Sequence, residues 1–119
     1  MAPVDLETRT TEFALRIIKL FAALPKTTEA QVIGKQLLRS GTSIGAHYRE
    51  AKRAKSTLDF INKIEGALQE LDESCYWPEL IEKSGLMSVK RLASLSGEAI
   101  ELTKILVTVV KRAKEKLKK

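Results

Sequence analysis

Apolar residues recur along this chain every three or four residues, the spacing of an amphipathic α-helix. Four such stretches follow one another, and no alternating strand-like pattern interrupts them. Helices are expected over residues 5–24, 28–55, 56–84 and from 88 towards the C-terminus. Because the connections are short, successive helices must run antiparallel. The pattern predicts an all-α fold, an antiparallel up-down-up-down four-helix bundle, as a single domain over residues 1–119 with a basic tail at 111–119.

Helix boundaries follow from local signals. Pro25 is expected to end the first helix, and Thr28 with Gln31 has the spacing of a capping box that opens the second. Ser56 and Ser88 are expected N-caps of the last two helices. Pro78 interrupts the third apolar pattern, so a kink or a restart of the helix is expected there.

Two glycines lie in the middle of the second helix, although glycine costs a helix about 1 kcal/mol relative to alanine. Gly41 and Gly45 are one turn apart on the same face. Close packing against a neighbouring helix would offset that loss, so this face is expected to be a tight helix–helix contact.

A polar stripe runs beside these glycines, formed by Arg39, Ser43, His47 and Glu50. One interpretation is a ligand or RNA site. The favoured one is a structural polar network that fixes the register between helices and includes Glu70 from the third helix. Arg39 needs a carboxylate partner in that case, and Glu50 and Glu70 are the candidates.

Several helices carry more apolar residues than one core stripe needs. The additional residues are Leu15, Ile18, Phe60, Ala67, Tyr76, Trp77, Ile100, Ile105, Val107 and Val110. Large exposed apolar patches mark interfaces, and aromatic residues are enriched at their centres. Tyr76 and Trp77 are therefore predicted oligomer-interface residues.

The charge pattern is uneven, although the net charge is only +6. Residues 35–55 carry six basic residues against one acid, and residues 56–84 carry seven acids against two lysines. The tail at 111–119 again has six basic residues against one acid. The two central blocks can neutralise each other, whereas nothing obvious neutralises the tail.

Neither a signal-peptide layout nor a membrane-spanning apolar run is recognised, and the single cysteine fits a reducing compartment. A cytoplasmic protein without membrane association is expected. One histidine cannot supply a di-iron site, and Cys75 lies on the core-facing stripe of a helix that has no histidine. The chain also lacks a P-loop. The sequence predicts no metal site, no cofactor and no enzymatic activity.

Basic residues at the ends of two helices are the better functional lead. Antiparallel packing places the end of the second helix and the end of the fourth at the same end of the bundle. The predicted nucleic-acid-binding residues are Arg49, Lys52, Arg53, Lys55, Lys111, Arg112, Lys114 and Lys116. Such a patch would bind phosphate backbones without base-specific readout.

Two segments resemble the four-helix-bundle family of 23S rRNA intervening-sequence proteins: residues 36–51, Gln-Leu-Leu-Arg-Ser-Gly-Thr-Ser-Ile-Gly-Ala-His-Tyr-Arg-Glu-Ala, and residues 67–77, Ala-Leu-Gln-Glu-Leu-Asp-Glu-Ser-Cys-Tyr-Trp. The family pattern usually has asparagine at position 47 and no proline at position 78. The resemblance implies a bundle that assembles into a ring, typically a homopentamer, without known enzymatic activity. It also implies similarity to the accessory pentamer of diversity-generating retroelements, whose basic surface binds nucleic acid and a reverse transcriptase.

Two functions are consistent with these observations. The first is a homo-oligomeric ring that binds RNA or DNA through its basic end. The alternative is a scaffold or adaptor for a protein partner, with the lysines serving only solubility.

Overall fold

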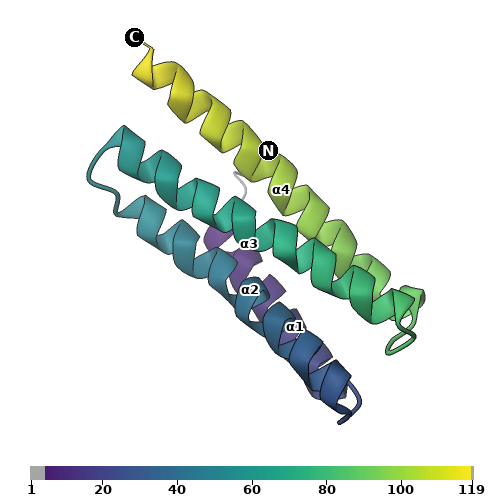
Figure 1. Cartoon of the computed structure of the whole chain (residues 1–119). Coiled ribbons are helices and arrows are strands. Elements are labelled where there is room, and N and C mark those ends of the chain that lie inside the picture. Colours follow the sequence, from purple (N-terminus) through teal and green to yellow (C-terminus); the bar gives the residue numbers. More distant parts are fainter. Residues whose placement is uncertain (1–4, 119) are drawn as a thin grey trace.

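The computed structural model describes residues 5–118, and within this range the chain forms four helices and no strand (Figure 1). The helices are α1 (Leu6–Ala23), α2 (Thr28–Lys52), α3 (Thr57–Lys83) and α4 (Val89–Leu117). The predicted all-α four-helix bundle is confirmed. The ends of the predicted domain, residues 1–4 and Lys119, lie outside the described residues.

Each helix packs against its neighbours in the sequence, and α4 meets α1 along a short stretch that closes the bundle. Within residues 5–118, the backbones of the diagonal pairs, α1 with α3 and α2 with α4, do not approach each other closely. The bundle is elongated, with principal extents of 52 × 30 × 21 Å. The α1–α4 edge is consequently the most open of the four.

The core contains fully buried side chains from every helix, such as Ile17, Ile44, Leu71 and Leu106. Ala67 and Val110 belong to the additional apolar residues, part of which was expected to be exposed, but these two lie in the core. Ala67 is 0% exposed and Val110 is 6% exposed. Each helix contacts two neighbours, so its buried sector is wider than a single stripe.

Side-chain caps start the helices. Ser56 accepts a hydrogen bond from the Asp59 backbone N–H, and Ser88 accepts one from Arg91, as predicted. The expected capping box at Thr28 is wrong by one residue. Thr27, in extended conformation, is the N-cap and accepts from the Ala30 N–H, because its backbone already leaves the helical region there. The second helix also ends earlier than expected, at Lys52.

Pro78 lies inside the continuous helix α3, so of the two expected outcomes, a kink or a restart, the restart is wrong. Proline removes one backbone donor, but Pro78 itself is buried, and Leu71 and Ile81 on either side are fully buried. This packing offsets the lost hydrogen bond. The helix ends at Lys83, and Gly85, with a φ of 76°, allows the Leu86 N–H to reach the Ile81 carbonyl in a Schellman motif.

The close contact expected at the two glycines of α2 is confirmed, and the neighbour is α1. A Cβ atom added at Gly41 would lie 2.6 Å from Ile17 Cγ1, and one added at Gly45 would lie 3.0 Å from Thr10 Oγ1. A Cβ atom at position 41 would force Ile17 to move, so the glycine there allows α1 to approach closely.

No helix within residues 5–118 is long and apolar enough to cross a membrane.

Candidate functional site

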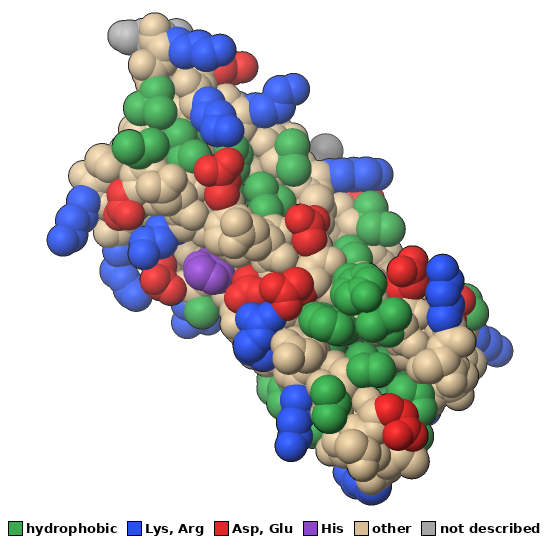
Figure 2. Space-filling model, viewed as in Figure 1, with side chains coloured by type: hydrophobic (Ala, Val, Ile, Leu, Met, Phe, Trp, Pro, Cys, Tyr) green, Lys and Arg blue, Asp and Glu red, His purple; other side chains and the backbone are tan. Residues whose placement is uncertain are grey.

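The basic ends of α2 and α4 lie at the same end of the bundle (Figure 1, upper left). Lys52 and Lys55, at the end of α2 and in the α2–α3 connection, line one hollow together with Lys116 of α4. The remaining wall consists of small residues, Phe60 and the first residues of α3. Figure 2 shows several Lys and Arg side chains projecting around this end. Packing thus brings together two clusters that are about 60 positions apart in the chain.

Acidic side chains neutralise part of this surface. Lys52 Nζ is 3.3 Å from Glu7 Oε1 of α1 and 5.9 Å from the centre of the Tyr48 ring. Lys114 Nζ lies 3.5 Å from Glu65 Oε2 of α3. These pairs are about half exposed, and pairs of this kind are weak and screened by salt. Both lysines therefore remain available to a phosphate.

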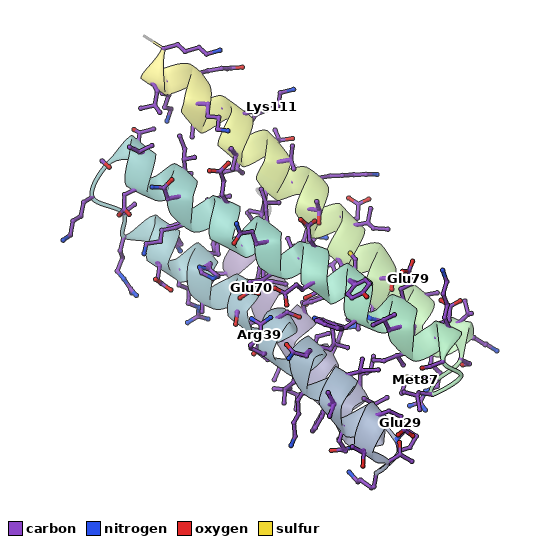
Figure 3. All side chains as sticks on the ribbon, viewed as in Figure 1. Glu29, Arg39, Glu70, Glu79, Met87 and Lys111 are labelled. Atoms are coloured by element: carbon purple, nitrogen blue, oxygen red, sulfur yellow. The ribbon has the colours of Figure 1, made fainter. Side chains whose placement is uncertain are left out.

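The two arginines near the end of α2 lie outside the hollow formed by Lys52, Lys55 and Lys116. Arg49 donates a hydrogen bond to Thr11 Oγ1 of α1 at 3.1 Å. Arg53, the C-cap of α2, lines a second hollow whose wall includes Glu50 and Asp59. Arg49 extends the basic surface towards α1, and Arg53 extends it towards the start of α3, but neither lines the hollow at Lys116. Lys111 and Arg112 are exposed on α4 (Figure 3 labels Lys111).

Arg39 bridges α2 and α3. Its guanidinium donates to both carboxylate oxygens of Glu70, at 3.1 and 3.2 Å, and also to Glu73. Figure 3 shows Arg39 and Glu70 facing each other between the two helices. The hydrogen bond to Glu70 raises the pKa of Arg39 above its usual value. Of the two candidate partners, Glu70 is the one that Arg39 binds.

His47 occupies the next position along the same seam. Its Nε2 lies 3.8 Å from Glu70 Oε2, and its ring fills the space that a Cβ atom at Gly66 would need. The single histidine is visible beside red carboxylate side chains in Figure 2. Its Nδ1 is buried and has no hydrogen-bond partner among the described residues. Gly66 thus leaves room for the imidazole in the α2–α3 contact.

Ser43 and Glu50 make contacts elsewhere. Ser43 Oγ donates to the carbonyl of Arg39 within its own helix, and Glu50 pairs with Lys63 Nζ at 3.4 Å. The five predicted residues therefore do not form one cluster. The structure brings Arg39, His47 and Glu70 together, whereas the side chains of Ser43 and Glu50 form no hydrogen bond or salt bridge with these three side chains.

Sequence reasoning missed Glu73 as a member of this cluster. Glu73 accepts hydrogen bonds from Arg39 and from the Trp77 indole N–H, the latter at 3.3 Å. It lies one turn after Glu70, and Trp77 lies one turn after Glu73. This spacing could have predicted that Glu73 faces Arg39, because residues three or four apart share a helix face.

Exposed apolar side chains lie on the outer faces of all four helices. Tyr76 of α3 is 50% exposed, whereas the adjacent Trp77 is half-buried against its own core. Ile100 and Val107 of α4 are exposed, as are Leu15 and Ile18 of α1. Figure 2 shows a gathering of hydrophobic side chains on the lower-right half of the visible face.

Within residues 5–118, no three His, Cys, Asp or Glu side chains are placed to hold a metal ion. Cys75 is half-buried against the core, and burial raises its pKa, with a further contribution from the charge of Asp72. A thiol with a raised pKa is a weak nucleophile at neutral pH.

The family model described as 23S rRNA-intervening sequence protein matches residues 4–108. A solved structure is also similar, the crystal structure of a protein with unknown function from the S23 ribosomal protein family of Bacteroides thetaiotaomicron VPI-5482. It is 40% identical, the alignment covers 88% of this chain and 97% of that one, and the TM-score is 0.83. No match was found among curated proteins. The matched range contains all four helices up to the last turns of α4, so this chain belongs to the 23S rRNA-intervening sequence protein family.

Proposed function

We propose that this protein is a non-enzymatic cytoplasmic homo-oligomer that binds RNA or DNA through the basic end of its bundle. The observation that carries the proposal is the hollow shared by Lys52, Lys55 and Lys116, two segments that only the folded chain brings together. No acidic residue lines this hollow. Clustered cations of this kind attract a phosphate backbone and release its counterions.

The basic side chains favour binding without sequence readout. Lysines outnumber arginines here, and a lysine ammonium acts as a point charge on phosphate, whereas base recognition in duplexes relies mainly on paired donors or acceptors. The family name refers to 23S rRNA, so structured ribosomal RNA is the natural first probe.

The outer apolar faces support assembly into a ring. Leu15 and Ile18 lie on α1, whereas Tyr76, Ile100 and Val107 lie on α3 and α4. Because α1 and α3 occupy diagonal corners, Leu15 and Ile18 lie on a different surface from Tyr76, whereas Ile100 and Val107 lie on α4, which adjoins both helices. Two different surfaces that bind each other give a heterologous contact, which produces a ring when the rotation between successive copies closes. A homopentamer is the ring that the family resemblance implies, and it would repeat the basic end five times.

Binding is tested by electrophoretic mobility shift of a structured RNA at low and at moderate salt. We expect a shift at low salt that weakens steeply as salt rises, as counterion release requires. The variant Lys52→Gln/Lys55→Gln/Lys116→Gln should weaken binding by about tenfold or more. The matched control is Lys19→Gln/Lys26→Gln/Lys90→Gln, which removes the same charge at the opposite end of the bundle.

Two outcomes contradict nucleic-acid binding. One is the absence of a shift at low salt with the oligomer intact, which would favour a scaffold for a protein partner. The other is an equal loss in both triple variants, which would assign the effect to net charge alone.

Assembly is tested by sedimentation at micromolar concentration. Tyr76→Glu and Ile100→Glu should dissociate the ring, because each buries a charge in an apolar contact. Val32→Glu, an equally exposed apolar position on α2, should leave the ring intact. A strictly monomeric wild-type protein would remove the assembly from the proposal.

A further inference from the structure

The hollow at Lys116 has an aromatic wall as well as a cationic rim. We infer that it seats one unpaired nucleotide of a single strand, with the phosphate at the lysines and the base against Phe60. This inference rests on the proposed nucleic-acid binding and names the form of nucleic acid that the site prefers.

The cationic side is formed by three lysines from two separate segments. Lys52 forms a salt bridge with Glu7, whereas Lys55 and Lys116 have no salt bridge to any described residue. The N-terminus of α3, capped by Ser56, lies at the same place, but so do the C-terminal ends of α2 and α4, and Asp59 accepts a hydrogen bond from the Lys55 backbone N–H, so the attraction rests on the lysine side chains and not on a helix dipole. A phosphate at this position would meet two ammonium groups, those of Lys55 and Lys116, that have no acidic partner among the described residues.

The apolar side is formed by Phe60 and by three alanines: Ala51, Ala54 and Ala113. Phe60 is half-buried and packs against the core, which holds the ring in place. Small alanine side chains keep the space beside the ring open. A flat, fixed aromatic surface next to clustered cations is the arrangement that binds single strands, where stacking adds to backbone attraction.

A paired base has no access to such a surface, since its faces are already stacked within the duplex. An acidic peptide would find the lysines but has no planar group to place on Phe60. The combination of ring and cations therefore favours a nucleotide from a single strand, a loop or a frayed end.

The experiment measures fluorescence anisotropy of a labelled oligouridine and of a duplex carrying the same number of phosphates. Both are titrated with wild-type protein, Phe60→Leu and Phe60→Trp. We expect the wild type to prefer the single strand, and Phe60→Leu to bind the single strand roughly tenfold more weakly with the duplex unchanged. Phe60→Trp retains an aromatic surface and should keep or strengthen the preference. A bromouridine-substituted strand should cross-link to Phe60.

Three results overturn the inference. Equal affinity of wild-type protein for the single strand and the duplex removes the preference. Unchanged single-strand binding by Phe60→Leu removes the role of the ring. Competition by polyglutamate as strong as that of oligouridine would assign the hollow to acidic peptides. In the first two results nucleic-acid binding itself persists, whereas a failure of the proposed function abolishes binding of both probes.

Discussion

The Ile17 side chain of α1 lies directly over the backbone of Gly41 in α2, where an added Cβ atom would be 2.6 Å from Ile17 Cγ1. Ile17 is fully buried, so it has little room to move. We expect Gly41→Ala to lower the free energy of unfolding by about 1–3 kcal/mol, although alanine is the better helix former. Chemical denaturation measures the change.

Gly97 of α4 provides the matched control. It is exposed, and an added Cβ atom there would meet nothing within 4 Å. Gly97→Ala should therefore stabilise the protein by about 0.5–1 kcal/mol. If both variants were stabilising, the contact at Gly41 would not be as tight as described.

Arg39 should contribute to stability rather than to nucleic-acid binding. Removing the cation leaves Glu70, only 13% exposed, with no arginine partner. Because Arg39 is itself half exposed, we expect Arg39→Met to lower the free energy of unfolding by only about 1 kcal/mol, with RNA affinity unchanged. Adding Glu70→Gln should recover part of that loss.

Lys83→Met serves as the control for Arg39. It removes an exposed 3.8 Å pair with Glu79 and should change stability by less than about 0.5 kcal/mol. An Arg39→Met protein of wild-type stability that no longer bound RNA would move Arg39 from the structural network to a binding site.

Arg9 and Glu98 join α1 and α4 at the most open edge of the bundle. Two hydrogen bonds connect them, Nη2 to Oε1 at 2.7 Å and Nε to Oε2 at 3.1 Å, and the pair is largely shielded from solvent. A double-mutant cycle with Arg9→Met and Glu98→Gln should give a coupling energy of about 1 kcal/mol. The more exposed Lys52–Glu7 pair should give a coupling energy close to zero. Equal coupling in the two pairs would contradict a special role for the α1–α4 bridge.

Asp5 should make stability depend on pH in the acid range. Hydrogen bonds from the side chain and backbone of Thr8 lower its pKa in the folded state. A lowered folded-state pKa stabilises the protein above the ordinary aspartate pKa of about 4, and this contribution disappears as pH falls through the folded-state value. The stability difference between wild type and Asp5→Asn, followed by urea midpoints, should be constant near neutrality and shrink in acid. A difference independent of pH would refute the assignment.

Cys75 should react slowly. Burial, and secondarily the charge of Asp72, raises its pKa, so little thiolate forms near neutral pH. We expect iodoacetamide to modify the native protein at pH 8 more than about tenfold more slowly than the urea-unfolded chain. Mass spectrometry follows the label, and Cys75→Ser shows the background. Equal rates in both states would mean that the thiol is freely accessible.

The helices could be predicted from the sequence because periodicity and capping residues are local. Ser56 and Ser88 begin their helices as expected. At Pro78 local signals could not decide between a kink and a restart, since the effect of this proline on α3 depends on the packing around it, which is not local. Which of the additional apolar residues are exposed could not be predicted for the same reason: Ala67 is buried because α3 has neighbours on two sides.

The candidate sites were harder to predict, because they depend on how two helices align. The Arg39–Glu70 pair followed from the need to neutralise a cation in the α2–α3 contact. The pairing of Glu50 with Lys63 could not be predicted in the same way, since it depends on how far α2 and α3 are shifted along each other. The hollow with Phe60 requires the end of α4 to reach the start of α3, and no local spacing reports that distance.

The open α1–α4 edge also bears on how the chain folds. The other three contacts join helices that are adjacent in the sequence, so each can form by closing a short loop. Only the α1–α4 contact requires the two ends of the chain to meet. Such a topology has a low contact order, and helical bundles of this kind fold in microseconds to milliseconds. We expect docking of α1 against α4, with formation of the Arg9–Glu98 bridge, to follow the rate-limiting step, so that removing this bridge speeds unfolding and leaves the folding rate almost unchanged.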